Sequence, residues 1–350
     1  MAGGSPGKLD GRVAVVTGAS SGVGRAIARL YAAEGARVAL IARDLIGLED
    51  AASEIRSTGG QAMVLPLDVS QSTAMMAAAD RVAFAWGGID VWVNDAMATI
   101  FSPAAEVPVD DLRRATDVTY LGAVWGTRAA LKRMKPRDHG TIVQVGSALA
   151  YRSIPLQAPY CAAKAALRGY TDALRCELAH DRSRVHLAMV HLSAFNTPQF
   201  EWGRTTLPFR PRPMGKIFQP EVAARAVYWA ATHRRRELWV GVPAVKAILG
   251  TYLFPGLLDR YLGRTAWDGQ NTGEPLPAGR RDNLHAPVPG DHGAHGRFDA
   301  LATSRSPQLW LDTHRGLVAA AALGALAAVG IMRAAAPMRA PRPRGSRGAG

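Results

Sequence analysis

Short apolar runs alternate with longer amphipathic stretches through the first 240 residues, and this alternation limits the folds open to the chain. The runs expected to form strands are 12–17, 37–42, 62–69, 89–95, 140–147, 184–192 and 237–241. The stretches expected to form helices are 24–35, 44–57, 70–86, 109–134, 158–180 and 219–231. Alternating strands and helices build βαβ units with right-handed crossovers and a parallel sheet covered on both faces. We therefore predict an α/β fold with a doubly wound parallel seven-stranded sheet, whose ligands bind beyond the carboxyl ends of the strands.

The alternating pattern weakens after residue 242, which predicts a change in organisation there. We expect a nucleotide-binding domain at 1–242, a loop-rich extension at 243–315, an apolar alanine-rich helix at 316–333 and a basic disordered tail at 334–350. The apolar helix could be a marginal membrane anchor, a helix lying in the membrane interface or an oligomer contact. Within the first domain, the proline- and arginine-rich segment 198–220 is expected to be a lid over the site rather than a surface excursion.

The charge and cysteine content limit the partners and the compartment. The formal net charge of +14 would suit nucleic acid, anionic lipid or a phosphorylated cofactor. Zinc-finger spacings and RNA-binding aromatic motifs are absent from the sequence, so no nucleic-acid partner is expected. The basic tail favours membrane contact. Two cysteines, Cys161 and Cys176, cannot form a disulfide framework, and the first twelve residues hold no apolar leader, which predicts a cytoplasmic, membrane-associated protein.

The sequence TGASSGVG at 17–24 joins the first predicted strand to the first predicted helix. Glycines there permit a tight turn and close approach of backbone to phosphate, and the helix N-terminus offers N–H groups to a pyrophosphate. A tight turn without a ligand is the alternative interpretation. The residues predicted to bind the cofactor here are Gly18, Ser20, Ser21, Gly22, Val23 and Gly24.

Three later strand ends carry further cofactor candidates. Arg43 follows the second strand, where NAD-binding folds usually hold an acidic residue, and its guanidinium suits a 2′-phosphate. NADP(H) is therefore predicted over NAD(H), although Arg43 could be a plain solvated charge. Asp68, beside Val69, could accept from the adenine amino group or cap a loop, and Asn94 ends the fourth strand beside the expected cofactor.

Together with Ser147, the YCAAK stretch at 160–164 and the NTP stretch at 196–198, these motifs resemble the short-chain dehydrogenase/reductase family over roughly residues 10–240. The C-terminal extension resembles a bacterial branch of that family. The resemblance implies a Rossmann-type sheet, NAD(P) binding and hydride transfer at a carbonyl or alcohol carbon. It also implies that Thr197 contacts the nicotinamide carboxamide and that the chain forms a homo-oligomer.

A serine, a tyrosine and a lysine are the predicted catalytic residues. Tyr160 and Lys164 are four residues apart on a predicted helix and share a face. A nearby ammonium and the positive nicotinamide would lower the pKa of the Tyr160 phenol, making it a usable general acid or base. Ser147 can hydrogen-bond the substrate oxygen as it gains charge. A Tyr–Lys pair on a helix can equally be structural.

The sequence departs from the family pattern at several positions. Met97 stands where the family has glycine, and Ser193 stands where it has proline. Thr119 replaces an asparagine that orders a water for proton relay, and we expect its hydroxyl to hold a water with altered geometry. These changes motivate an alternative function, a catalytically silent NADP(H)-binding sensor or scaffold at the membrane.

The predicted function is an NADP(H)-dependent oxidoreductase acting on a hydrophobic carbonyl or secondary alcohol. The expected pocket lining is apolar and comprises Leu149, Tyr151, Leu192, Phe195 and the 198–220 segment. The GDHGAHG stretch at 290–296 has a spacing that permits metal ligation, but no scaffold for a metal is evident, and no metal is predicted.

Overall fold

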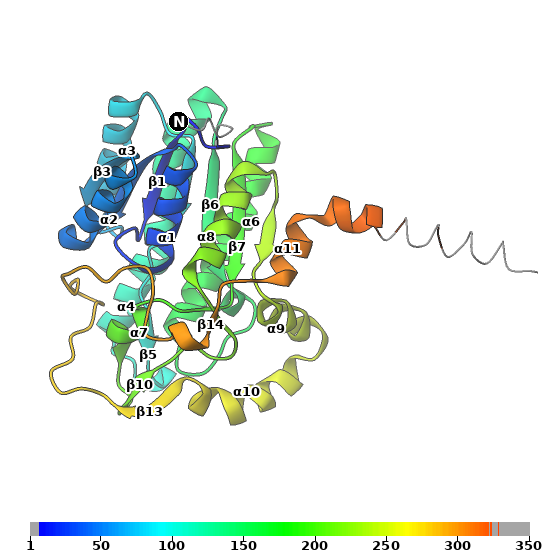
Figure 1. Ribbon diagram of the computed structural model, residues 1–350. Helices are drawn as coiled ribbons and strands as arrows, with labels where there is room; N and C mark the ends of the chain where they lie inside the picture. The colour runs from blue at the N-terminus through cyan, green and yellow to red at the C-terminus, as the bar shows by residue number, and fades with distance from the viewer. Residues whose placement is uncertain (1–6, 322, 324–327, 329–350) are drawn as a thin grey trace, which may run out of the picture. The chain divides into compact units, whose positions relative to one another are not determined.

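Seven parallel strands form the central sheet of the computed structural model, which describes residues 7–321, 323 and 328 (Figure 1). The strands lie in the order β12-β7-β6-β4-β1-β2-β3. Their bounds are β1 Val13–Thr17, β2 Arg37–Ala42, β3 Gln61–Pro66, β4 Val91–Asn94, β6 Thr141–Ser147, β7 His186–Leu192 and β12 Glu237–Trp239. Every neighbouring pair is parallel. The predicted doubly wound, seven-stranded α/β fold is confirmed.

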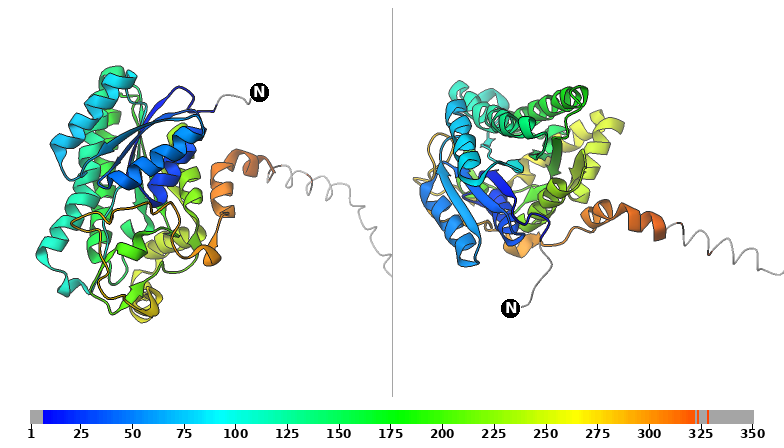
Figure 2. Two further views of the ribbon diagram at one scale, coloured as in Figure 1. Left: turned by 60° about the vertical axis from the view of Figure 1, so that its left-hand side comes forward. Right: turned by 90° about the horizontal axis from the view of Figure 1, so that it is seen from above.

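Helices cover both faces of this sheet (Figure 2). One apolar core joins the sheet to α1 Gly22–Ala33, α2 Leu45–Ser57 and α8 Pro220–Thr232. The other joins it to α3 Ser72–Trp86, α4 Val109–Thr116, α5 Gly122–Met134 and α6 Ala158–His180. In β1, Ala14 and Val16 enter the first core while Val13 and Val15 enter the second. Successive side chains of a strand point to opposite faces, so a strand buried on both faces must be apolar throughout.

The chain reverses direction across the sheet between β1 and β4. From β1 it runs outward through β2 and β3, and then it returns to build β4, β6, β7 and β12 on the other side. A crevice opens at such a switch point, beyond the carboxyl ends of the strands, because the flanking crossovers diverge there. The motifs predicted to bind the cofactor all follow strands that end at this edge.

The helix expected over 109–134 is interrupted. A π-helical turn, Asp117–Leu121, separates α4 from α5. Within this turn Thr119 is buried, and its hydroxyl accepts from the Ala98 N–H (2.9 Å) and donates to the Ala98 carbonyl (3.1 Å). The π-helical turn, which is wider than an α-helical one, therefore lies at the point where Thr119 attaches it to the loop that follows β4.

Short strands tie the segment 198–220 to distant parts of the chain. This segment contains α7 Gln199–Trp202, β9 Arg204–Thr205, β10 Phe209–Pro211 and β11 Ile217–Phe218. Strand β9 pairs with β5 Ile100–Phe101, β10 pairs with β13 Asn271–Pro275, and β11 lies between β8 Ala194–Phe195 and β14 Ala302–Thr303. Each of the three short strands in the segment expected to be a lid therefore pairs with a strand from another part of the chain.

The structure draws no boundary at residue 242, because one compact unit runs to Leu309. The extension contains two helices, α9 Val242–Leu253 and α10 Pro255–Gly269, before it reaches β13. Four single turns of 3₁₀ helix complete this unit: η1 Ala104–Glu106, η3 Lys135–Arg137, η4 Ala148–Ala150 and η5 Asp299–Leu301.

Helix α11, Pro307–Thr313, leads into a second unit that starts at Trp310. In that unit the Trp310 ring stacks on His314, with the ring centroids 4.6 Å apart. Residues 316–321 of the predicted apolar segment are helical, whereas most of 322–333 and all of the predicted basic tail lie outside the described residues. Over the described part of the chain, every helix is too short or too polar to cross a bilayer.

Candidate functional site

A cavity of about 590 Å³ lies at the carboxyl edge of the sheet. It brings together twelve of the fifteen residues predicted from the sequence. These twelve are Gly18, Ser20, Ser21, Gly22, Val23, Arg43, Asp68, Val69, Ser147, Tyr160, Lys164 and Thr197. Its size is that of a small-molecule or cofactor site, and it extends from the glycine turn to the predicted catalytic residues.

The glycine turn allows helix α1 to start directly against the end of β1. A Cβ atom built on Gly24 would lie 2.3 Å from the Gly18 carbonyl oxygen, so no side chain fits there. Gly24 itself does not line the cavity. It acts by letting the first turn of α1 approach the strand, which places the N-terminus of the helix at the edge of the cavity.

Helix α6 places Tyr160 and Lys164 on the cavity wall, one turn apart. The Lys164 ammonium donates to the Val145 carbonyl (2.7 Å) and lies 5.6 Å from the centre of the Tyr160 ring. Ser147 ends β6 opposite them, and its hydroxyl accepts from the Leu149 N–H (3.1 Å). Because that bond uses an acceptor position only, the Ser147 proton remains available for donation, and Ser147 lies close enough to Tyr160 to act to lower the pKa of its phenol.

Burial dominates the electrostatics of these side chains. It raises the pKa of Tyr160 above its usual range, and the Ser147 hydrogen bond only partly opposes this. Burial also lowers the pKa of Lys164, while the nearby Asp95 carboxylate acts to raise it. The pKa of Asp95 is in turn raised by burial and held down by Lys164. Burial therefore raises the Tyr160 pKa in this structure, whereas the sequence led us to expect a lowering by Lys164 and the positive nicotinamide.

Two arginines, Arg43 and Arg114, lie close together at the end of the cavity where the sequence predicts the adenosine of the cofactor. The Arg114 guanidinium contacts Asp68 at 2.5 Å, and Asp68 also accepts from the Ser70 N–H (2.9 Å). Burial opposes ionisation of Asp68, but Arg114 and Ser70 hold the pKa of its carboxyl below the usual value. Arg43 lies beside this pair and donates to the carbonyls of Asn283, Leu284 and His285. The charge of the Asp68 carboxylate is thus balanced by Arg114, and the Arg43 guanidinium leaves a net positive charge at this end of the cavity.

Asn94 and Thr119 do not reach the cavity. Asn94 is buried and is bonded to Trp92, Thr127 and Gln144. The Thr119 hydroxyl is engaged on both sides with Ala98. Both side chains therefore hold the sheet and the loop after β4 in place around the site.

The sequence interpretation missed two contributors to the cavity wall. Asp95 lines the cavity immediately after Asn94, and an ionisable residue at a strand end was the available signal. The second contributor is the extension, which supplies Pro243 and Ala244 from α9, Tyr261 and Leu262 from α10, and Asn283, Pro287, Val288 and His292 from the segment after β13. Of the expected apolar lining, Leu149, Leu192 and Phe195 are present, whereas Tyr151 donates its hydroxyl to Glu237 instead (2.8 Å).

Comparison with known proteins agrees with this geometry. A family model described as short chain dehydrogenase matches residues 12–205. The uncharacterized oxidoreductase YxnA of Bacillus subtilis is 32% identical over 322 residues, which cover 91% of this chain and 90% of the relative. The D-threitol dehydrogenase of Mycolicibacterium smegmatis is 33% identical over 64% of this chain and 87% of its own length. A crystal structure of a metagenomic short-chain oxidoreductase in complex with NADP superposes with a TM-score of 0.58 at 29% identity, covering 67% of this chain and 98% of that one.

Proposed function

The chain belongs to the short-chain dehydrogenases, and we propose that it is an NADP(H)-dependent enzyme that transfers a hydride to or from a hydrophobic carbonyl or secondary alcohol. The observation that carries this proposal is that Ser147, Tyr160 and Lys164 line the same cavity as the glycine turn and Arg43. The bound nicotinamide would supply or accept the hydride. The side chains of this chain supply everything else that the reaction needs.

Ser147 and Tyr160 would handle the substrate oxygen. In reduction the Ser147 hydroxyl donates to the carbonyl oxygen as negative charge develops, and Tyr160 delivers the proton. In oxidation Tyr160 accepts the alcohol proton. The Lys164 ammonium stabilises the Tyr160 phenolate, which reduction produces and oxidation consumes, and the half-buried Asp95 carboxylate helps Lys164 to keep its proton. Since the Thr119 hydroxyl is engaged with Ala98, we propose that Thr119 positions the loop containing Met97 rather than holding a relay water.

The preference for NADP(H) is supported by the charge at the adenosine end. Arg43 and Arg114 face one carboxylate, Asp68. Arg43 has five N–H donors, and its Nε–H makes no hydrogen bond within the part of the chain that the structure describes. A bound 2′-phosphate would therefore meet the Arg43 guanidinium, whose charge Asp68 does not balance, and could accept a hydrogen bond from its unused Nε–H. The NADP complex of the metagenomic relative is consistent with this assignment.

The far end of the cavity supports a hydrophobic substrate. Its wall there is formed by Ile154, Met214, Leu258, Tyr261 and Leu262. Leu258, Tyr261 and Leu262 come from α10, so the extension contributes to the wall expected to face the substrate. Binding to an apolar wall becomes more favourable as the substrate buries more apolar surface area there. A lipid-like or polycyclic ketone is therefore favoured over a polar one.

Helices α9 and α10 also support the proposal of membrane contact. Large apolar side chains are exposed along them, namely Leu249, Tyr252, Leu253, Phe254, Leu257 and Tyr261. On the same helices the exposed cations, Lys246, Arg260 and Arg264, outnumber the exposed acids, Asp259 and Asp268. This composition suits the surface of an anionic membrane, from which a hydrophobic substrate could enter the cavity. Sedimentation of anionic vesicles should remove the wild-type protein, but not Leu253→Glu, from the supernatant. A wild-type dimer that light scattering shows to become a monomer in Leu253→Glu, with no binding to vesicles, would contradict membrane contact.

The test of the proposed reaction is turnover of NADPH with a panel of apolar ketones. Tyr160→Phe should bind NADPH as the wild type does and lose turnover by roughly 10²- to 10⁴-fold, since it removes the proton donor alone. Tyr170→Phe, on the same helix, is the matched control and should keep full activity. Tight NADPH binding with no turnover by the wild type would favour the silent sensor or scaffold instead.

The cofactor preference is tested by the ratio of affinities rather than by either affinity alone. Arg43→Asp removes a donor to the 2′-phosphate and also three bonds to the extension. Loss of those bonds affects NADPH and NADH alike, whereas loss of the phosphate contact affects only NADPH. We expect the NADPH:NADH affinity ratio to fall at least tenfold, and an unchanged ratio would refute the role of Arg43.

A further inference from the structure

Residues 283–298, which we call the strap, run along the whole cofactor side of the cavity. The strap follows β13 and in Figure 1 passes the ends of α1 and α2 before it reaches β14. It contacts three positions that the sequence assigned independently to the dinucleotide: Arg43 for the 2′-phosphate, Gly22 for the pyrophosphate and Thr197 for the nicotinamide.

At the adenosine end the strap is held by cations and by burial. Arg43 donates to the carbonyls of three successive residues, Asn283, Leu284 and His285. Arg114 also donates to the Leu284 carbonyl (3.0 Å), and the Leu284 side chain is fully buried in the second core. This end of the strap is therefore held by two guanidinium groups and by one fully buried side chain.

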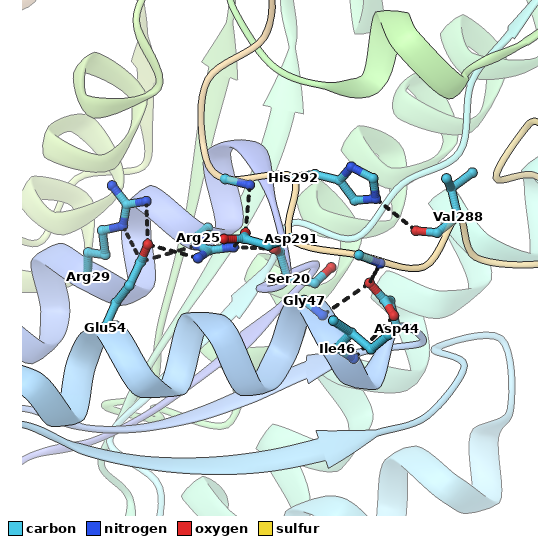
Figure 3. A network of polar contacts seen from close by, with 12 residues as sticks. Ser20, Arg25, Arg29, Asp44, Ile46, Gly47, Glu54, Val288, Asp291 and His292 are labelled. Carbon is cyan, nitrogen blue, oxygen red and sulfur yellow. Dashed lines mark hydrogen bonds and ion pairs between the residues drawn. The ribbon is translucent and has the colours of Figure 1, made fainter.

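The middle of the strap is bonded to the first turns of α1 and α2. The Gly290 N–H donates to the Asp44 carboxylate (3.2 Å), which also caps α2 by accepting from the Gly47 N–H (3.1 Å). The Gly22 N–H, at the start of α1, donates to the Gly293 carbonyl (3.0 Å). Asp291 forms an ion pair with Arg25 at 2.5 Å (Figure 3).

At the nicotinamide end the strap lies against the backbone of Asn196 and Thr197. The Gly296 N–H donates to the Asn196 carbonyl (3.3 Å), and the Phe298 N–H donates to the Asn196 side chain (3.0 Å). A Cβ atom on Gly296 would lie 2.5 Å from the Thr197 carbonyl oxygen, so only glycine permits this approach.

The strap covers the cofactor side of the cavity without filling it. Asn283, Pro287, Val288 and His292 form part of the wall of the same 590 Å³ cavity that the glycine turn and Tyr160 line. The strap and the carboxyl edge of the sheet therefore line one cavity, which is large enough for a small ligand.

The contact at Asp291 can break without leaving a buried charge unpaired. The Arg25 side chain is 1% exposed and is also bonded to both oxygens of Glu54 (2.8 and 3.1 Å), whereas Asp291 is 52% exposed. When Asp291 leaves, Arg25 keeps Glu54 and Asp291 is hydrated. The middle of the strap thus has a contact that can be made and broken reversibly.

We propose that the strap closes over the bound dinucleotide and that breaking the Arg25–Asp291 ion pair gates cofactor release. The inference rests on the proposed function, since it requires that the cavity bind NADP(H). The strap then encloses the cofactor from adenosine to nicotinamide, and exchange between turnovers requires its middle and nicotinamide ends to detach from α1, α2 and Thr197.

The experiment is the rate of NADPH release from the full-length protein, followed by stopped-flow fluorescence during displacement by excess NADP⁺. Asp291→Asn keeps the shape but removes the charge, and we expect release about 3- to 10-fold faster with correspondingly weaker binding. Asp181→Asn, which breaks the surface ion pair with Lys135 (2.7 Å), is the matched control and should release NADPH at the wild-type rate. A release rate unchanged by Asp291→Asn would overturn the gate.

Hydrogen exchange of the wild-type strap provides a second measurement that needs no variant. Amides of 286–296 should exchange more slowly when NADPH is bound, and faster exchange would show that the cofactor displaces the strap. Tighter and faster NADPH binding by Asp291→Asn, with release unchanged, would likewise identify a blocking segment and overturn the inference. Absence of NADPH binding by the folded wild type would instead overturn the proposed function, and the inference with it.

Discussion

Replacing Asn94 by alanine distinguishes a cofactor contact from a structural one. Asn94 ends β4, where the sequence predicted a contact with the cofactor, yet its side chain is bonded within the protein. Its amide oxygen accepts from the Trp92 indole N–H (2.8 Å), and its amide nitrogen donates to Gln144 and Thr127 (both 3.0 Å). All four residues are buried.

The magnitude follows from the partners that lose their bonds. In Asn94→Ala the Trp92 indole N–H and the Gln144 amide oxygen are left unpaired, whereas Thr127 keeps Gln144 and the Ala123 carbonyl. Each unsatisfied buried group costs about 1–3 kcal/mol, so the free energy of unfolding should fall by about 2–6 kcal/mol. At roughly 2 °C per kcal/mol for a chain of this size, Tm should fall by about 4–12 °C.

The assay pairs thermal unfolding with NADPH titration at a temperature where the variant is fully folded. We expect the loss of stability to come with an NADPH affinity within about twofold of the wild type. Asn271→Ala, in the exposed strand β13, is the matched control and should change Tm by little. A tenfold loss of NADPH affinity at unchanged Tm would refute this reasoning and restore the cofactor contact.

Two further changes test the electrostatics and the close packing of the site. Asp95→Asn removes the negative charge that helps Lys164 to keep its proton, so the pKa of Lys164 should fall further. The alkaline limb of log kcat/KM against pH should then move to lower pH by about one unit. A pH profile that stays in place would exclude the coupling between Asp95 and Lys164. Gly24→Ala puts a Cβ 2.3 Å from the Gly18 carbonyl oxygen and should lower Tm and abolish NADPH binding, whereas Gly169→Ala, in α6 with open space around it, should raise stability by roughly 0.5–1 kcal/mol in urea unfolding. Equal effects of the two substitutions would show that close packing at Gly24 is unimportant.

The central sheet could be predicted because its strands are buried on both faces. A run such as VAVVT must be apolar at every position, and that pattern is visible without knowledge of its neighbours. The strands that were missed, such as β9 and β11, are two residues long and pair with residues far away in the sequence. Periodicity needs more residues than that, so these strands carry no local signal.

The interruption at Asp117–Leu121 was missed for a related reason. A π turn adds a single residue to a helix, and a window long enough to show amphipathic periodicity averages over it. Its consequence was local and chemical: Thr119 bonds to Ala98 instead of reaching the cavity.

Predictions for the site were limited by side-chain direction at strand ends. The motifs located the cavity, because the carboxyl ends of parallel strands meet at one edge. At the end of β4, however, Asn94 points into the structure while the next residue, Asp95, lines the cavity. A shift of one residue reverses the direction of a side chain in extended backbone, and sequence alone does not fix where the strand ends.

The strap could not be found by the same reasoning, because backbone groups make most of its contacts. Arg43 is bonded to carbonyl groups, Gly22 is bonded to the Gly293 carbonyl, and Gly296 is needed only because the Thr197 carbonyl lies so close. The GDHGAHG stretch was interpreted through its histidines, yet His292 packs on Trp202 with ring centroids 4.3 Å apart, and its glycines lie against the nucleotide site. In a chain whose first glycine turn is predicted to bind a phosphate, we therefore interpret a second glycine-rich segment without periodicity as backbone that can approach the same ligand from the other side.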